Sequence, residues 1–99
     1  MLIYHIVLPE TWNSLNRSVD YSADSIETEG FIHCSYDHQL EAVLKRYYSD
    51  AKEVIILAVD TKKLASRLVE EPSTNNEIYP HIYGPINQDA IVAAETKKL

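Results

Sequence analysis

"EVIILAVD", residues 53 to 60, is a continuous apolar run closed at both ends by an acidic residue. A run of this length without polar alternation is typical of a central strand that is covered on both faces. Such a strand needs partners in a sheet, so we also expect strands at residues 2–8 and 90–95. Pro9 directly follows the first of these runs, as a breaker that ends a strand would. Residues 53–60 therefore define the sheet around which the fold is built.

Short helices and further strands are expected between these runs. Pro9 suits the first turn of a short helix through residues 10–17. Residues 18–29 have weak periodicity, and we expect irregular chain there with one helical turn at residues 24–28. Ser35 or Asp37 can cap a helix over residues 38–48, and Asp60 or Thr61 can cap a short helix over residues 62–67. The other expected segments are strands at residues 31–34 and 67–71, a loop at residues 70–77 and extended chain at residues 78–86.

This irregular alternation of elements predicts the class α+β, with mixed, mostly antiparallel sheets and short helices. A chain of 99 residues suits a single domain spanning residues 1–99. The formal net charge of -6 makes a nucleic-acid partner unlikely, because proteins that bind phosphate backbones cluster lysine and arginine on one face. The single cysteine and the absence of a long apolar run favour a cytoplasmic protein that does not span a membrane. The sequence does not define an oligomeric state.

Three of the four histidines, His5, His33 and His81, lie in apolar or strand-like segments. A single strand histidine is most often a hydrogen-bonded core residue. Burial of three imidazoles requires three sets of hydrogen-bond partners, and the hypotheses of separate core histidines and of one shared polar site therefore stay equally open. His38 is expected at the surface, at the start of a helix.

A metal site is one hypothesis for these histidines, with Cys34 as a fourth ligand. Their spacing matches no compact ligand motif, and alternation along a strand places His33 and Cys34 on opposite faces. We therefore expect no metal. Cys34 is expected to be a packed thiol, while His33 and Ser35 form a polar pair on the other face.

The stretch "PHIYGPI", residues 80 to 86, is the second candidate for a site. His81 and Tyr83 share a strand face beside Gly84, where the backbone must turn or something must approach closely. A planar ligand could stack on Tyr83 and hydrogen-bond to both side chains. An aromatic corner that closes the core explains the same residues equally well.

The order of these motifs resembles the domain of unknown function 952 family. The resemblance extends from Ile3 to about Val92 and rests on "YHI" near the start, Trp12, Gln39, "VIILAVD", Glu71, "DAIV" and two signatures. The signatures are "PHIYGPI" and Y-x-x-x-S-I-x-x-E-G-F-I-H-C-S, which begins at Tyr21.

The resemblance implies a fold like that of the ADP-ribosyltransferases, which bind NAD in a cleft between two small sheets. By this likeness, His5 corresponds to the first-strand histidine that contacts the NAD ribose, and His33 or Ser35 to the polar residue of the second strand. Glu95 lies in a late strand, but no signature marks it as the glutamate of such enzymes.

Two functional hypotheses follow. In the first, the protein binds NAD or a related nucleotide, with His5, His33 and His81 as candidate catalytic residues, Ser35, Tyr83 and Gly84 as candidate ligand-binding residues, and NAD-cleaving or ADP-ribosyl transfer chemistry. In the second, the protein is a non-enzymatic ligand-binding or accessory domain whose histidines are structural.

Overall fold

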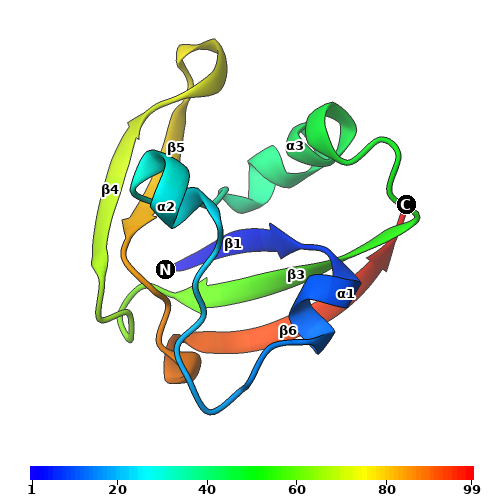
Figure 1. Ribbon diagram of the computed structural model, residues 1–99. Coiled ribbons are helices and arrows are strands. Elements are labelled where there is room, and N and C mark those ends of the chain that lie inside the picture. The colour runs from blue at the N-terminus through cyan, green and yellow to red at the C-terminus, as the bar shows by residue number, and fades with distance from the viewer.

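The structure is a computed structural model that describes residues 1–99. It contains two three-stranded antiparallel sheets and a few short helices, which confirms the α+β class (Figure 1). The first sheet has the order β1-β3-β6, and its strands are β1 (Leu2–Val7), β3 (Glu53–Asp60) and β6 (Ile91–Lys98). The second has the order β2-β5-β4, and its strands are β2 (Ile32–His33), β5 (Ile78–Tyr83) and β4 (Arg67–Pro72). The helical segments are α1 (Pro9–Asn13), α2 (Ser25–Glu29), η1 (Asp37–Gln39), α3 (Leu40–Tyr47), η2 (Thr74–Asn76) and η3 (Gln88–Ala90).

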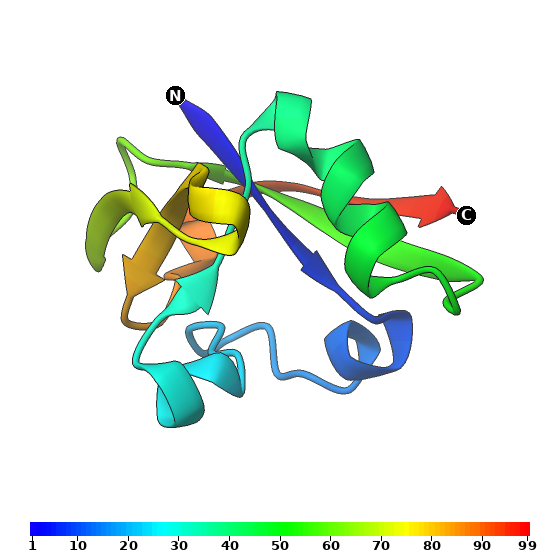
Figure 2. The ribbon, with the colours of Figure 1, turned by 90° about the horizontal axis from the view of Figure 1, so that it is seen from above.

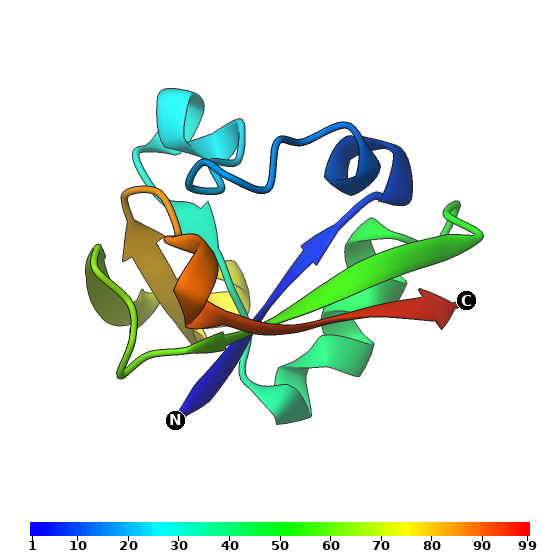
Figure 3. The ribbon, with the colours of Figure 1, turned by 90° about the horizontal axis from the view of Figure 1, so that it is seen from below.

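The central position predicted for residues 53–60 is confirmed. β3 pairs with β1 on one side, with His5 opposite Leu57, and with β6 on the other, with Ala94 opposite Leu57. β6 has no strand partner on its second edge (Figure 3). Both faces of β3 carry buried side chains, which explains why its apolar residues do not alternate with polar ones.

The main hydrophobic core lies between the two sheets. Leu57 of β3 and Ile82 of β5 are both fully buried in this one cluster, which therefore joins the sheets. Trp12 and Tyr21, from the segment that runs from α1 to α2, belong to the same core. The remaining buried members are Ile3, Val7, Ile32, Cys34, Ile55, Val59, Ile86 and Ala90.

α3 packs on the opposite face of the first sheet. Leu44 forms a second cluster with Ile6 and Val54, whose side chains alternate with those that enter the main core. Figure 2 shows α3 on one side of β1, with α1 and α2 on the other. The first sheet is thus covered on both faces, as a fully apolar central strand requires.

Two predicted helices differ from the structure. The helix expected through residue 17 ends at Asn13, and residues 62–67 form no helix, since a turn at residues 61–63 leads to β4, which begins at Arg67. In this connection, the Lys62 N–H donates to Asp60 Oδ1 over 3.0 Å, and the Ala65 N–H donates to Asn87 Oδ1 over 2.9 Å. In a helix over these residues the Ala65 N–H would donate to the Thr61 carbonyl, and the Asn87 side chain accepts from it instead.

The strand expected at residues 90–95 is β6, and the helix expected at residues 38–48 corresponds to η1 followed by α3. Within the expected loop at residues 70–77, β4 continues to Pro72 and η2 follows it. No helix has the length and apolar character needed to cross a membrane.

Candidate functional site

The two sheets are joined at one point, where Tyr4 of β1 pairs with Ser35 just beyond β2. The Tyr4 N–H donates to the Ser35 carbonyl over 2.8 Å, and the Ser35 N–H donates to the Tyr4 carbonyl over 2.7 Å. In an antiparallel ladder, the next such pair would be Ile6 with His33. That pair does not form, and the His33 carbonyl accepts from the His5 ring instead. The main-chain N–H and C=O of Ile6 therefore face a gap between the sheets.

His5 fills part of this gap. Its Nδ1–H donates to the His33 carbonyl over 2.6 Å, and its Nε2 accepts from the Tyr21 hydroxyl over 2.8 Å. Burial lowers the pKa of His5 to about 4 and raises the pKa of Tyr21, so the imidazole is neutral at physiological pH. The carbonyl and the hydroxyl together fix one tautomer. Both ring nitrogens are occupied, and a ligand that hydrogen-bonds to His5 must first replace one of these partners.

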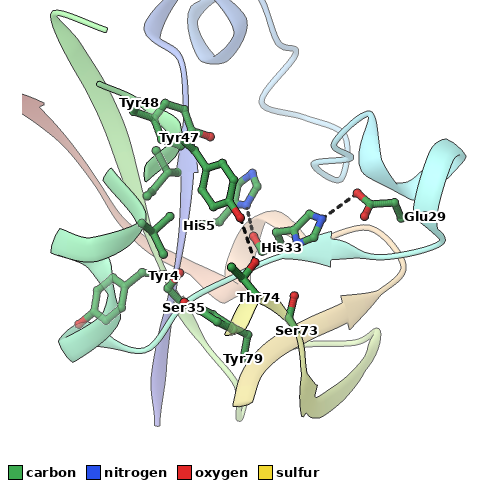
Figure 4. Close-up of a pocket in the computed structure, with 12 residues that line it drawn as sticks. Tyr4, His5, Glu29, His33, Ser35, Tyr47, Tyr48, Ser73, Thr74 and Tyr79 are labelled. Atoms are coloured by element: carbon green, nitrogen blue, oxygen red, sulfur yellow. Dashed lines mark hydrogen bonds and ion pairs between the residues drawn. The ribbon is translucent and has the colours of Figure 1, made fainter. Parts of the chain in front are cut away.

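A cleft of about 570 Å³ opens beside this gap, between α3, β1 and the second sheet (Figure 4). This volume is in the usual range of small-molecule sites. The lining combines aromatic rings, hydroxyl groups and one carboxylate, and it contains no lysine or arginine. Its residues are Tyr4, His5, Ile6, Glu29, His33, Ser35, Val43, Tyr47, Tyr48, Ser73, Thr74 and Tyr79.

Glu29 and His33 form a hydrogen-bonded polar pair at one end of the cleft. Glu29 is the last residue of α2, and Gly30 caps this helix with a left-handed φ of 88°. The turn brings the Glu29 Oε2 atom to 2.8 Å from the His33 Nε2 atom, as Figure 4 shows. Each side chain is about half exposed. A ligand in the cleft can therefore reach both groups.

The mouth of the cleft is bridged by a hydrogen bond between Tyr47 of α3 and Thr74 of η2. The two hydroxyl oxygens are 2.9 Å apart (Figure 4). The guanidinium of Arg46 lies 5.8 Å from the centre of the Tyr47 ring. A positive charge is thus present at the rim, although none lines the interior.

A second polar cluster occupies the adjoining surface of the second sheet. Glu71 Oε2 accepts from His81 Nδ1–H over 2.6 Å and from the Tyr83 hydroxyl over 2.5 Å. These two hydrogen bonds, with that from Tyr83 the stronger influence, lower the pKa of Glu71. The Phe31 ring is stacked on His81 with a centroid distance of 4.0 Å. The His81 Nε2 atom is buried and has no hydrogen-bond partner.

The structure brings some of the predicted site residues together and separates others. His5, His33 and Ser35 line the cleft, whereas His81, Tyr83 and Gly84 do not. His33 connects the two groups, because its ring centre lies 5.5 Å from that of His81. Cys34 is buried on the opposite face from His33, as predicted, and burial raises the pKa of its thiol. No group of three His, Cys, Asp or Glu side chains is arranged to hold a metal ion.

Sequence reasoning missed most of the cleft. Four of the seven tyrosines, Tyr4, Tyr47, Tyr48 and Tyr79, line it, and they come from β1, from the end of α3 and the residue after it, and from β5. Glu29 was visible as part of the "EGFIHCS" signature, but no spacing rule assigns it to a site. Glu95, the late-strand glutamate, does not line the cleft.

The fold and the cleft define a small α+β domain with a tyrosine-rich cleft where two antiparallel sheets separate. Residues 6–94 match the family described as "Protein of unknown function (DUF952)", and the chain belongs to this family.

The comparisons with solved structures support the same fold. Protein CC0527 from Caulobacter crescentus has a TM-score of 0.84 and 25% sequence identity, with 100% of this chain and 88% of that chain covered. A double mutant of the same protein gives a TM-score of 0.84 and 24% identity at the same coverage. No curated protein matches the chain.

Proposed function

We propose that the cleft binds NAD or a closely related ribonucleotide, in an architecture of the ADP-ribosyltransferase kind. The observation that carries the proposal is the composition of the cleft, which is lined by four tyrosines and by one carboxylate–imidazole pair. The proposal also places the protein in the cytoplasm, where NAD is available.

Three features of the cleft support a pyridinium nucleotide. Tyrosine faces attract a flat cation, and the Glu29 carboxylate complements its positive charge. The N–H and C=O of Ile6, which face the gap, offer a donor and an acceptor to a carboxamide. Arg46 at the rim can approach the pyrophosphate of such a ligand, while the interior receives its uncharged and cationic parts.

The chemistry that this arrangement favours is cleavage of the nicotinamide–ribose bond. The C1′–N bond breaks and its electron pair leaves with the nicotinamide nitrogen, while Glu29 stabilises the positive charge that develops on the ribose. A water oxygen then bonds to C1′, and the released proton passes through Glu29 or His33 to solvent. The products are nicotinamide, ADP-ribose and a proton. His5 is neutral and fully hydrogen-bonded, so its role in this scheme is to hold β1 and β2 at the gap.

Titration with NAD and ADP-ribose, followed by NMR of the histidine rings and by chromatography of released nicotinamide, tests the proposal. We expect the His33 signals to shift with either ligand. Glu29→Gln should lower nicotinamide release roughly 100-fold or more, because it removes the only carboxylate in the cleft. Glu27→Gln is the matched control, since Glu27 is an exposed carboxylate of the same helix that does not line the cleft. Unchanged histidine signals at millimolar ligand would refute nucleotide binding.

A non-enzymatic binding domain is the second candidate. The observation that favours it is the engagement of His5 by internal partners at both ring nitrogens, which leaves His5 unavailable for proton transfer. This candidate predicts that NAD shifts the His33 signals while no nicotinamide is released. Equal release by the wild-type protein and the Glu29→Gln variant would also support binding without catalysis.

A further inference from the structure

The His81 side chain has one hydrogen-bonding atom that the folded protein does not use. The residue is 2% exposed, and its Nε2 atom is buried without a partner. A buried polar atom without a partner loses its hydrogen bonds to water and gains nothing in return. Such an atom is uncommon in a folded protein, and its presence here indicates a site where a ligand can supply the missing hydrogen bond.

Glu71 determines what this atom can do. Because the Glu71 carboxylate accepts from His81 at Nδ1, the neutral imidazole has its proton on Nδ1 and a free electron pair on Nε2. The free atom is therefore a hydrogen-bond acceptor that is held in place by a carboxylate. Its natural partner is a donor such as a hydroxyl group.

The direction of Nε2 follows from the strand order. β5 lies between β4 and β2, and Glu71 approaches the ring from β4. The Nε2 edge is on the side of the ring away from Glu71. The Phe31 ring is stacked on a face of the His81 ring, with ring centres 4.0 Å apart, and the His33 and His81 rings meet edge to face, with ring centres 5.5 Å apart. His33 also lines the cleft, so the unused acceptor belongs to a ring that is next to a cleft residue.

Phe31 is the side chain that covers His81. Its ring contacts the rings of His33, His81 and Tyr83, at centroid distances of 4.8, 4.0 and 5.3 Å, and it is only partly buried. It follows Gly30, whose φ of 88° few other residues adopt and where an added Cβ would meet nothing within 4 Å. A rotation of Phe31 away from His81 would break this ring stacking.

We propose that Phe31 is a movable cover over a polar subsite, in which His81 Nε2 accepts a hydrogen bond from a sugar hydroxyl of the molecule bound in the cleft. This proposal depends on the proposed function in one respect only, which is the identity of the sugar as a ribose. Its floor is formed by His81, Glu71 and Tyr83, and it communicates with the cleft past His33. The Glu71 carboxylate makes the subsite unsuitable for phosphate, and a neutral polyol is the ligand class that fits it.

The cover can be tested without any nucleotide. Diethyl pyrocarbonate modifies accessible neutral imidazoles, and peptide mass spectrometry measures its rate at each histidine. His38, which is exposed, and His5, which is buried with both nitrogens bonded, are internal references for fast and slow modification. We expect His81 to react at an intermediate rate in the wild-type protein.

Variants at Phe31 separate a movable cover from a fixed core residue. Phe31→Ala should raise the rate at His81 roughly tenfold, because it removes the stacked ring, and should leave the rate at His5 unchanged. Phe31→Leu keeps an apolar side chain that preserves packing, but it removes the ring stacking. The rate of His81 modification should therefore rise less in this variant than in Phe31→Ala. Modification of His81 as slowly as His5 in all three proteins would overturn the proposal.

Ligand protection tests the occupant of the subsite. D-ribose and ADP-ribose should each slow the modification of His81 in the Phe31→Leu variant, with no change at His38. Protection by D-ribose alone would refute the nucleotide proposal and leave the subsite intact. If neither probe protects His81, although its rate rises in the variants, the assignment of a sugar hydroxyl is wrong.

Discussion

Acidification from about pH 7 to about pH 5 should destabilise the wild-type protein more than a His5→Gln variant. His5 is neutral in the folded protein because burial lowers its pKa from 6.5 to about 4. The unfolded chain therefore binds more protons than the folded protein in this pH range. Stability from the neutral imidazole is present above pH 6.5 and is lost as the pH falls from 6.5 toward 4. A glutamine side chain binds no proton in this pH range, so the His5→Gln variant does not lose stability in this way.

The size of the effect follows from the two pKa values. A folded-state pKa of about 4 and an unfolded-state pKa of 6.5 give a loss of about 2 kcal/mol between about pH 7 and about pH 5. Most carboxylates remain ionised at the lower of these values. The His5→Gln variant will be less stable at neutral pH, because it disrupts the contacts to Tyr21 and to the His33 carbonyl. The comparison therefore concerns the slope of stability with pH and not its absolute value.

Urea unfolding of both proteins at a series of pH values measures this slope. Tyr21→Phe provides a second perturbation, since it removes the donor to His5 Nε2 and keeps a titrating imidazole. We expect it to cost about 1–3 kcal/mol at neutral pH. Parallel curves for the wild-type protein and His5→Gln would refute the reasoning, as would a His5 ring that titrates by NMR at its ordinary pKa.

Three further predictions concern single side chains. Leu57→Ala should lower the free energy of unfolding by about 2–5 kcal/mol in urea titrations, because Leu57 is fully buried on the central strand. Gly84→Ala should lower the midpoint of thermal unfolding, since an added Cβ would lie 2.6 Å from Ser66 Oγ at a φ of 147°; an unchanged midpoint would show that the turn can relax. The Cys34 thiol should react with a thiol reagent only on unfolding, because it is buried with a raised pKa, and rapid labelling of the native protein would contradict this placement.

The strands were the most predictable part of the fold. The apolar run at residues 53–60 and the run before Pro9 correspond to β3 and β1, because burial on both faces removes the alternation that a half-exposed strand shows. The turn at residues 61–63 was not predictable as such. Its last residue contacts Asn87, which is distant in the sequence and donates from Nδ2 to the Lys63 carbonyl over 2.9 Å.

Only the part of the candidate site that lies within one extended segment was predictable from the sequence. Alternation along "FIHCS" placed His33 and Ser35 on one face and Cys34 on the other, and the structure agrees. The tyrosines of the cleft carry no such pattern. Tyr47 and Thr74 meet across its mouth although 27 positions separate them in the sequence.

The sequence by itself determined that residues 53–60 form a covered central strand and that the segment from Gly30 to Ser35 has one polar and one packed face. Both results depend on the regular geometry of a strand, which fixes the direction of successive side chains. Only the tertiary structure decided the states of the histidines. His5 is neutral because burial lowers its pKa, and Tyr21 and the His33 carbonyl fix its tautomer, whereas His81 has a free acceptor because Glu71 occupies its other nitrogen. These states depend on which groups the fold brings within hydrogen-bonding distance: His5 meets its partners where β1 and β2 separate, and His81 meets Glu71 between β5 and β4.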